Sequence, residues 1–275
     1  MRSAIPAALA CLVLSGAAFA APAGKPVPKP LSRVLSMNAS STGPGVEASN
    51  PASGMRGKAQ KQAAETLGLQ TGAAWRYKQI DKLLKSRAAL LSQTYDFKHL
   101  LMDDGKVLPP VIVEADGSFS VQNDSEAVAT QRTYKIVKPA RIVGGAPSWR
   151  DYLYKDYPPA KQVNQAILPK NGAESRRWRK YVRKGWKEGV AQANRVFRIA
   201  LSRLTRDYLG MLRFKRLAMA HVVSAPMLAA GKVGIVVGHH RLQVGQKVFR
   251  LTVPAHFNGA GKWSPVIARQ HGGGH

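Results

Sequence analysis

The chain has 275 residues, with 42 Lys and Arg against 15 Asp and Glu, and a formal net charge of +27. This charge favours anionic partners, namely nucleic acid, anionic lipid, peptidoglycan carboxylates or acidic proteins, although a solvated basic surface without a specific partner explains it equally well. Beyond the N-terminal apolar run, no stretch reaches the roughly 18 apolar residues that a transmembrane helix needs.

The first 20 residues have the features of a cleavable secretory signal. Arg2 supplies a positive charge, the run from Ala4 to Leu14 is almost wholly apolar, and Ala18-Phe19-Ala20 offers small residues at the cleavage positions. We place the cleavage between Ala20 and Ala21. The mature chain then lacks cysteine, because the only one is Cys11, and this excludes disulfides, a thiolate metal site and a cysteine nucleophile.

Residues 21–55 are dense in Pro, Gly, Ser, Ala and Asn, and they show neither a helical nor an alternating period. Such a composition predicts disorder. A folded region is expected over residues 56–268, long enough for one large domain or two small ones. The glycine-rich residues 269–275 are expected to form a frayed tail.

Two long helices are predicted, over residues 57–97 and 171–223. The first carries one apolar stripe, although Gly68 and Gly72 weaken its first half. The second begins with Asn171 three residues before Glu174, which is the spacing of a capping box. Its stripe contains small residues at 185, 189 and 193, which leave a flat groove where another backbone could approach closely. We expect the two helices to form an antiparallel pair.

Short strands are predicted between and after these helices. Residues 111–113 and 118–121 flank Asp116-Gly117, a hairpin signal, and residues 134–137 and 140–143 extend a small antiparallel sheet. A short helix is expected over residues 149–153, with Ser148 as its N-cap.

The C-terminal region has three further strand patterns, joined by glycine-bearing turns. They cover residues 233–237, 241–244 and 247–253, and they predict a β-meander. The predicted fold class is therefore α+β: a long antiparallel helix pair packed with short antiparallel β-strands and a C-terminal β-meander.

No motif for catalysis or cofactor binding is found. The sequence contains no P-loop, no dinucleotide-binding glycine motif, no HExxH and no GxSxG. His239 and His240 are adjacent in a predicted turn, and His271 and His275 lie in the tail, so no metal site is expected. Asp151, Asp156 and Asp207 each neighbour a basic residue, so ion pairing explains them. We expect neither a cofactor nor enzyme activity.

The start of the second helix is rich in basic and aromatic residues. The cations are Arg176, Arg177, Arg179, Lys180, Arg183, Lys184 and Lys187, and the aromatic residues are Trp178, Tyr181 and Trp186. Such a mixture can hold phosphates and stack bases. However, Trp178 lies on the apolar stripe, so packing explains part of the aromatic content. Non-specific binding of nucleic acid is expected, whereas specific binding is not.

Several short strings, in their order and spacing, resemble those of a known family. They are Gly72-Ala-Ala-Trp75-Arg76, Val107-Leu-Pro-Pro-Val111, Arg132-Thr-Tyr-Lys135, Pro147-Ser-Trp149-Arg150-Asp151-Tyr152-Leu153, Leu168-Pro169-Lys170-Asn171, Trp178, Tyr181, Gly185-Trp186, Gly189-Val190-Ala191-Gln192-Ala193, Arg206-Asp207-Tyr208 and Gly210-Met211. The chain is similar in these strings, from about Gly57 to Ile267, to the DotC family of type IVB secretion and conjugation machines, called TraI in IncI-type conjugation systems.

The resemblance implies a structural, non-enzymatic component of the secretion core complex in the periplasm, associated with the outer membrane of a Gram-negative bacterium. Its partners would be DotD-like and DotH-like proteins, and it would support placement of the DotH-like channel. Family members are generally lipoproteins, whereas Cys11 is not placed in a lipobox. Attachment to the outer membrane is therefore expected through partner proteins.

Trp149, Arg150 and Tyr152 are the residues predicted to contact a partner. The alternative is that Trp149 and Tyr152 belong to the core and that Arg150 pairs with Asp151 or another neighbour. A second hypothesis for the whole chain is a periplasmic basic module that binds an anionic polymer, either DNA in transit or peptidoglycan.

Overall fold

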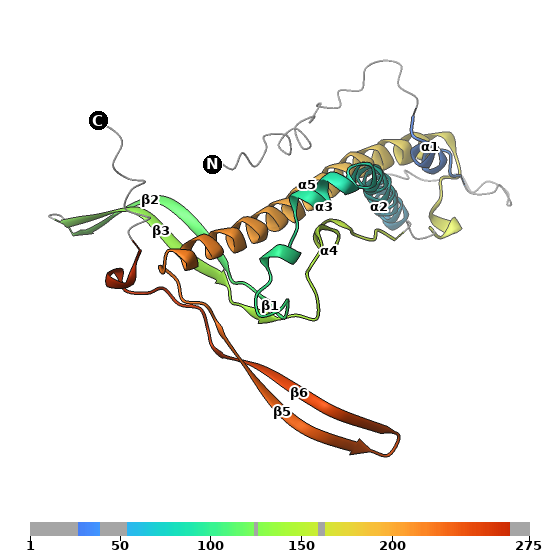
Figure 1. Cartoon of the computed structure of the whole chain (residues 1–275). Helices are drawn as coiled ribbons and strands as arrows, with labels where there is room; N and C mark the ends of the chain where they lie inside the picture. The colour runs from blue at the N-terminus through green and yellow to red at the C-terminus, as the bar shows by residue number, and fades with distance from the viewer. Residues whose placement is uncertain (1–26, 39–53, 124–125, 159–162, 265–275) are drawn as a thin grey trace. The chain divides into compact units, whose positions relative to one another are not determined.

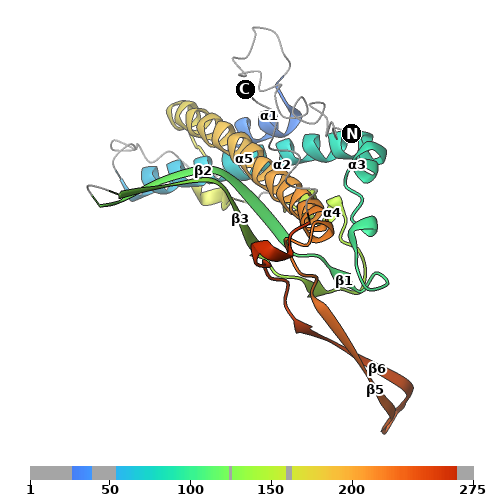
Figure 2. The same ribbon diagram turned by 60° about the vertical axis from the view of Figure 1, so that its left-hand side comes forward.

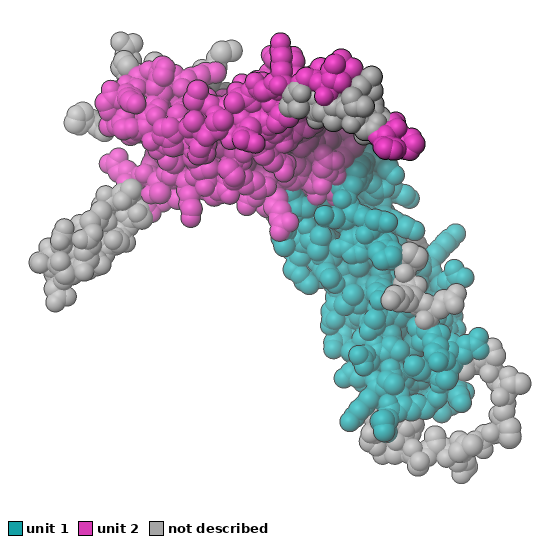
Figure 3. Space-filling model, turned by 90° about the horizontal axis from the view of Figure 1, so that it is seen from below, with its two compact units in different colours: residues 1–87, 154–200 teal, residues 88–153, 201–275 magenta. Residues whose placement is uncertain are grey.

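The computed structural model describes residues 27–38, 54–123, 126–158 and 163–264, and it divides into two compact units. The first unit contains residues up to Arg87 and Tyr154–Ala200, and the second contains Ala88–Leu153 and the residues from Leu201 onward (Figure 3). The predicted signal with its cleavage position between Ala20 and Ala21, and the predicted tail, lie outside the described residues.

The first unit is built on a close pair of helices, α2 (Met55–Ser86) and the first part of α5 (Gly172–Met219) (Figure 1). A Cβ atom placed on Gly185 would lie 2.1 Å from the carbonyl oxygen of Glu65, and one on Gly189 would lie 2.1 Å from that of Leu69. The predicted groove of small residues therefore receives a backbone. Gly68 and Gly72 face the backbone of Val182 and Trp186 in the same way, so they allow the contact as well.

The direction of this pair differs from the prediction. Glu65 lies at Gly185, Leu69 at Gly189, and Arg76 donates from its Nε atom to Asn194 Oδ1 over 2.7 Å, so residue numbers rise together along both helices. The helices run in the same direction (Figure 2), and the predicted antiparallel orientation is wrong. A short connection favours antiparallel neighbours, but here residues 87–171 lie between the two helices and allow the chain to return to its starting end.

A short helix, α1 (Lys29–Leu35), lies within the stretch predicted to be disordered. Its Val34 is buried among Ala64, Leu67, Trp178 and Val182, and the indole nitrogen of Trp178 donates to the Val34 carbonyl over 3.1 Å. A helix of seven residues is too short to show a periodic pattern. The helix is ordered because its apolar side chains are buried against the rest of the folded unit. The prediction of disorder is wrong for these residues.

The second unit combines short helices with three two-stranded antiparallel sheets among the described residues. Its helical elements are α3 (Ala88–Thr94), η2 (Lys98–Leu100), α4 (Trp149–Leu153), the end of α5 and η4 (Ala260–Lys262), whereas η3 (Gln165–Ile167) belongs to the first unit. Its sheets pair β1 (Val107–Leu108) with β4 (Arg141–Ile142), β2 (Val111–Asn123) with β3 (Glu126–Lys138), and β5 (Met227–Gly238) with β6 (Arg241–Val253). The predicted class of mixed helices and short antiparallel strands, with a long helix pair, is confirmed.

The Asp116-Gly117 pair does not form the predicted hairpin turn. Strand β2 continues through it to Asn123, with Asp116 opposite Arg132 and Ser118 opposite Thr130. Gly117 supplies a φ of +56° within the strand. The local preference for a turn is overridden because β3 offers a continuous ladder on both sides of the dipeptide.

The predicted C-terminal meander is a single long hairpin. Gly234 is opposite Gln246 and Ile235 is opposite Val244, so Gly245, with a φ of +70°, is an extra residue in β6. The glycine that predicted a turn therefore forms a bulge, and the strand continues past it. The prediction of a third strand is wrong, since residues 241–253 form one strand.

Helix α5 ends on the core of the second unit. Phe214 and Leu217 on the helix and Val222 and Val223 after it pack with Ile112 of β2. Gly210 lets β2 approach, because a Cβ atom there would lie 2.4 Å from a methyl group of Val111. Within the described residues, no helix combines the length and apolar character required to cross a membrane.

Candidate partner-binding surfaces

Helix α4 carries the residues predicted to contact a partner, and two reciprocal hydrogen bonds fix its start. The Ser148 hydroxyl accepts from the backbone N–H of Arg150 over 3.2 Å, and the Asp151 carboxylate accepts from the backbone N–H of Ser148 over 2.7 Å. This is a capping box with Asp in the acidic role. The predicted N-cap at Ser148 is confirmed, and it holds a helix of five residues in one orientation.

Trp149 lies in the core of the second unit. Its side chain is 1% exposed, and its indole nitrogen donates to the Ser92 hydroxyl over 2.9 Å. A buried tryptophan whose N–H has a partner contributes packing without an unsatisfied polar group. Trp149 therefore lies in the core, which was the alternative to its predicted contact with a partner.

Tyr152 is partly buried and reaches an ionic cluster. Its ring stacks on Phe97 with centroids 5.9 Å apart, and its hydroxyl donates to Asp207 over 3.1 Å. Burial, followed by the charge of Asp207, raises the pKa of the Tyr152 hydroxyl. The hydroxyl therefore stays protonated and available as a donor.

Asp207 is the centre of that cluster and has no exposed surface. It accepts a hydrogen bond from Lys138 of β3 over 2.5 Å, two from the Arg206 guanidinium over 2.9 and 3.1 Å, and one from the Tyr152 hydroxyl. Burial alone would raise the pKa of the Asp207 carboxyl, but the hydrogen bonds from Lys138 and Arg206 hold it below its usual value. Ion pairing of Asp207 was predicted from its sequence neighbour. The contributions of Lys138 and Tyr152 were not predicted, because they come from distant elements.

Arg150 is the exposed member of the predicted trio. Its guanidinium lies over the Trp149 ring, 4.4 Å from the ring centroid, in a cation–π contact. In the part of the chain that the structure describes, it forms no ion pair with Asp151 or another carboxylate. Of the three residues, Arg150 alone offers an exposed charged group, and its contact with a partner stays a prediction.

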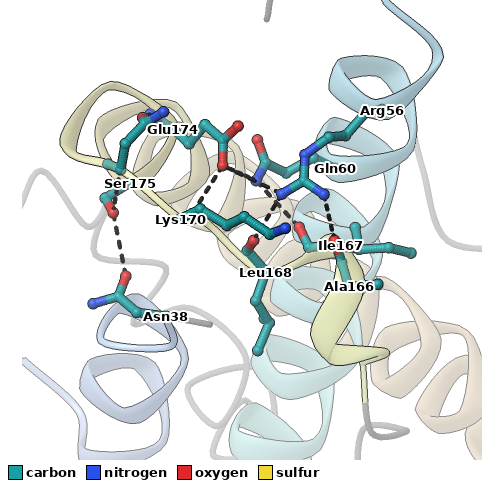
Figure 4. A network of polar contacts seen from close by, with 10 residues as sticks. Asn38, Arg56, Gln60, Ala166, Ile167, Leu168, Lys170, Glu174 and Ser175 are labelled. Carbon is teal, nitrogen blue, oxygen red and sulfur yellow. Dashed lines mark hydrogen bonds and ion pairs between the residues drawn. The ribbon is translucent and has the colours of Figure 1, made fainter. Parts of the chain in front are cut away.

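A second polar network fixes the start of α5 in the first unit (Figure 4). Asn171 accepts from the backbone N–H of Glu174 over 2.8 Å, which confirms its predicted capping role. The Glu174 carboxylate, in turn, accepts from the backbone N–H of Lys170 and from the side chains of Gln60 and Arg56 of α2 over 2.9, 3.4 and 3.5 Å. Burial would raise the Glu174 pKa, but these donors hold it below its usual value.

The two tryptophans at the start of α5 are not presented to solvent together with the cations, and Tyr181 is only partly exposed. Trp178 and Trp186 are buried, and Trp186 packs against Trp75 with ring centroids 5.3 Å apart. The ammonium of Lys61 lies over the ring of Tyr181, at 5.3 Å from its centroid. These rings belong to the packing of the helix pair and do not form a platform for stacking bases.

The basic residues, by contrast, line a shallow hollow of about 500 Å³ on α5. Its lining consists of Arg176, Lys180, Arg183, Lys184, Lys187 and Glu188. The ammonium of Lys184 is paired with Glu65 of α2 at 3.1 Å. The sequence predicted the basic cluster, but only the structure separates its cations from its aromatic residues.

The β5–β6 hairpin is a further exposed surface; strands were predicted in this region, but an exposed face for a partner was not. Among the described residues its sheet has two strands, so both outer edges lack a neighbouring strand. Ile235 and Val244 are opposite each other, with 63% and 70% of their surface exposed. Residues 227–253 contain four Lys and Arg and no Asp or Glu. The hairpin is therefore both apolar and basic.

No group of three or more His, Cys, Asp and Glu side chains that could hold a metal ion occurs among the described residues. The rings of His239 and His240 lie at the hairpin tip with centroids 6.0 Å apart. His271 and His275 lie outside the described residues.

Residues 54–265 match the model of a protein family, TraI of type IV secretion, whose description is "type IV secretory system, conjugal DNA-protein transfer". The matched range covers most of the chain and extends over parts of both compact units. No curated protein matches the chain.

Proposed function

The chain belongs to this TraI family of type IV secretory systems for conjugal DNA-protein transfer, and we propose that it is a structural component of the outer-membrane core complex of such a system. In this proposal it has no enzyme activity. It acts in the periplasm together with DotD-like and DotH-like proteins, and it supports the assembly or placement of the DotH-like channel at the outer membrane.

The β5–β6 hairpin is the observation that supports a role in assembly. A two-stranded hairpin is marginally stable in water on its own, and open strand edges are templates for pairing with another chain. Ile235 and Val244 form an exposed apolar pair on it. Burial of this pair and of a strand edge by a partner would stabilise both proteins, as in β-strand addition.

The charge of the hairpin indicates the kind of partner that it would accept. With four cations and no carboxylate in residues 227–253, two copies of the hairpin would repel each other. A neutral or acidic strand edge with apolar side chains would complement it. We therefore propose that the hairpin binds a different protein of the complex and not a second copy of this chain, and we take the DotH-like channel component as that partner.

The experiment for this proposal is recovery of partners with a tagged chain in its native host. In the Ile235→Ser/Val244→Ser variant, recovery of the DotH-like protein should fall at least tenfold, because the apolar contact is lost. Ile199→Ser/Met219→Ser is the matched control, since both residues are exposed hydrophobic residues on α5. Equal recovery with both variants, when circular dichroism shows that both are folded, would exclude the hairpin as the contact.

Arg150 offers a separate test of the predicted α4 contact. The Arg150→Ala variant removes an exposed charge and should leave the fold intact, whereas Trp149→Ala would open a cavity in the core. If α4 contacts a partner, Arg150→Ala should reduce recovery several-fold. Unchanged recovery would remove α4 from the proposal without affecting the hairpin.

The proposed location in the periplasm requires export. Mass spectrometry of the mature N-terminus should find Ala21 as the first residue, since the signal is proposed to be cleaved after Ala20. A mature chain that begins with an acylated Cys11 would contradict this cleavage and would indicate direct attachment to the membrane.

A further inference from the structure

Four cations form a row on one face at the start of α5. Arg176, Lys180, Arg183 and Lys187 are separated by four, three and four residues, which places them on the same face of an α-helix. At 1.5 Å per residue, the row is about 16 Å long. All four side chains line the hollow of about 500 Å³. We call these residues the cation row.

The cation row lacks internal neutralisation among the described residues. Lys184, which also lines the hollow, lies 3.1 Å from Glu65 and 4.0 Å from Glu188. None of the four residues of the row forms an ion pair in the described ranges. A ligand of the row must therefore bring its own negative charges, spaced along a line.

The side chains around the row define the chemistry of that ligand. Among the residues that the structure describes, no aromatic or aliphatic residue lines the hollow, and the nearby Trp178 and Trp186 are buried. Stacking of bases requires exposed rings, and insertion into a membrane interface requires exposed apolar side chains. The row offers neither, so its contacts are limited to anionic groups such as phosphates.

We propose that the cation row binds the sugar-phosphate backbone of DNA without reading its sequence. Arginine and lysine side chains that neutralise successive phosphates release counterions and give affinity that is independent of sequence. DNA is favoured over other phosphate polymers because the family is one of conjugal DNA-protein transfer. This activity is additional to the proposed role in assembly and does not depend on it.

The test compares two variants of the full chain with equal charge. The first replaces the row, Arg176→Gln/Lys180→Gln/Arg183→Gln/Lys187→Gln. The control, Arg195→Gln/Arg198→Gln/Arg203→Gln/Arg216→Gln, removes four exposed cations elsewhere on α5. Binding of fluorescent duplex and single-stranded DNA is measured by anisotropy at a series of NaCl concentrations. Circular dichroism establishes that each variant is folded, and the two halves of the row variant provide substitutes if the full variant does not fold.

If four phosphate contacts are lost, the slope of log K against log salt should become shallower by about 3.6 for duplex DNA and by about 2.8 for single strands. The control should change the slope by less than half as much. Equal losses in the two variants would overturn the proposal, because net charge alone would then explain the binding. Vesicles that contain phosphatidylglycerol provide the last comparison: a row variant that loses vesicle binding but retains DNA binding would also overturn it.

Discussion

Two buried carboxylates connect elements that are distant in sequence. Charged side chains are rarely buried unless they are paired. Asp207 collects donors from β3, α4 and α5, and Glu174 collects donors from α2 and from the loop before α5. Each carboxylate is therefore a fixed point within its own unit, and its loss should be measurable as a loss of stability.

For Asp207, we predict that Asp207→Asn lowers the free energy of unfolding by about 1–3 kcal/mol, because an amide accepts fewer charge-assisted hydrogen bonds from Lys138 and Arg206. Chemical denaturation of the variant measures this loss. Asp104→Asn is the control, since the Asp104 side chain is 95% exposed, and its effect should stay below about 0.5 kcal/mol. A loss of similar size in both variants would contradict the assignment.

Stability should also depend on acid pH through these carboxyls. The pKa values of Asp207 and Glu174 are lowered in the folded state from ordinary values of 3.8 and 4.5, so the unfolded state binds more protons in this range. The free energy of unfolding must therefore rise with pH there. The stabilisation is complete above the ordinary values and is lost as the pH falls through the lowered ones. Denaturation between pH 2 and 6 should show a flatter dependence in Asp207→Asn and Glu174→Gln than in the unchanged chain. An unchanged dependence in both would show that other carboxyls are responsible.

At the scale of elements, the pair of α2 and α5 depends on glycines that face carbonyl oxygens. Gly185 and Gly189 on α5, and Gly68 and Gly72 on α2, place each backbone against the other helix. Helices that contact through small residues can approach more closely than the usual 8–10 Å between axes. The first unit is therefore sensitive to a single methyl group at these positions.

We predict that Gly185→Ala destabilises the chain by about 1–3 kcal/mol or more, because its Cβ atom would lie 2.1 Å from the Glu65 carbonyl oxygen and the helices must separate. Gly172→Ala is the matched control. Its Cβ atom would be 3.7 Å from the end of the Arg176 side chain, an ordinary contact. Thermal unfolding followed by circular dichroism should separate the two variants, and equal midpoints would disprove the close approach.

The whole molecule is dominated by its excess of positive charge. With 42 Lys and Arg against 15 Asp and Glu, most cations cannot be paired with a carboxylate of the chain. A net charge far from zero destabilises a compact state through repulsion between like charges, and salt screens this repulsion within a Debye length of about 10 Å at 0.1 M.

We therefore predict that NaCl raises the midpoint of thermal unfolding between low and physiological ionic strength. Differential scanning calorimetry at constant pH measures the change, and sucrose at equal osmolarity serves as the control for effects that do not depend on charge. A midpoint that falls as NaCl increases would mean that the ion pairs, and not the repulsion, dominate the electrostatic contribution to stability.

Local signals in the sequence were reliable where the chain interacts with itself over a few residues. Asn171 caps α5 and Ser148 caps α4. In each case the side-chain oxygen accepts a hydrogen bond from a backbone N–H two or three residues later. Signals that compete with distant partners failed. Asp116-Gly117 continues a strand, since β3 supplies the ladder, and Gly245 forms a bulge in β6 instead of a turn.

The sequence by itself determined the family, the mixed class of long helices and short strands, the helix caps, and the basic and small-residue faces of α5. All of these depend on residue type and spacing along the chain. Only the tertiary structure decided that the helix pair is parallel, that Val34 orders α1, that Trp149 is buried while Arg150 is exposed, and that the cations of α5 are separated from its aromatic residues. These properties depend on which distant surfaces meet, and the free energy of such contacts is not encoded in any local pattern.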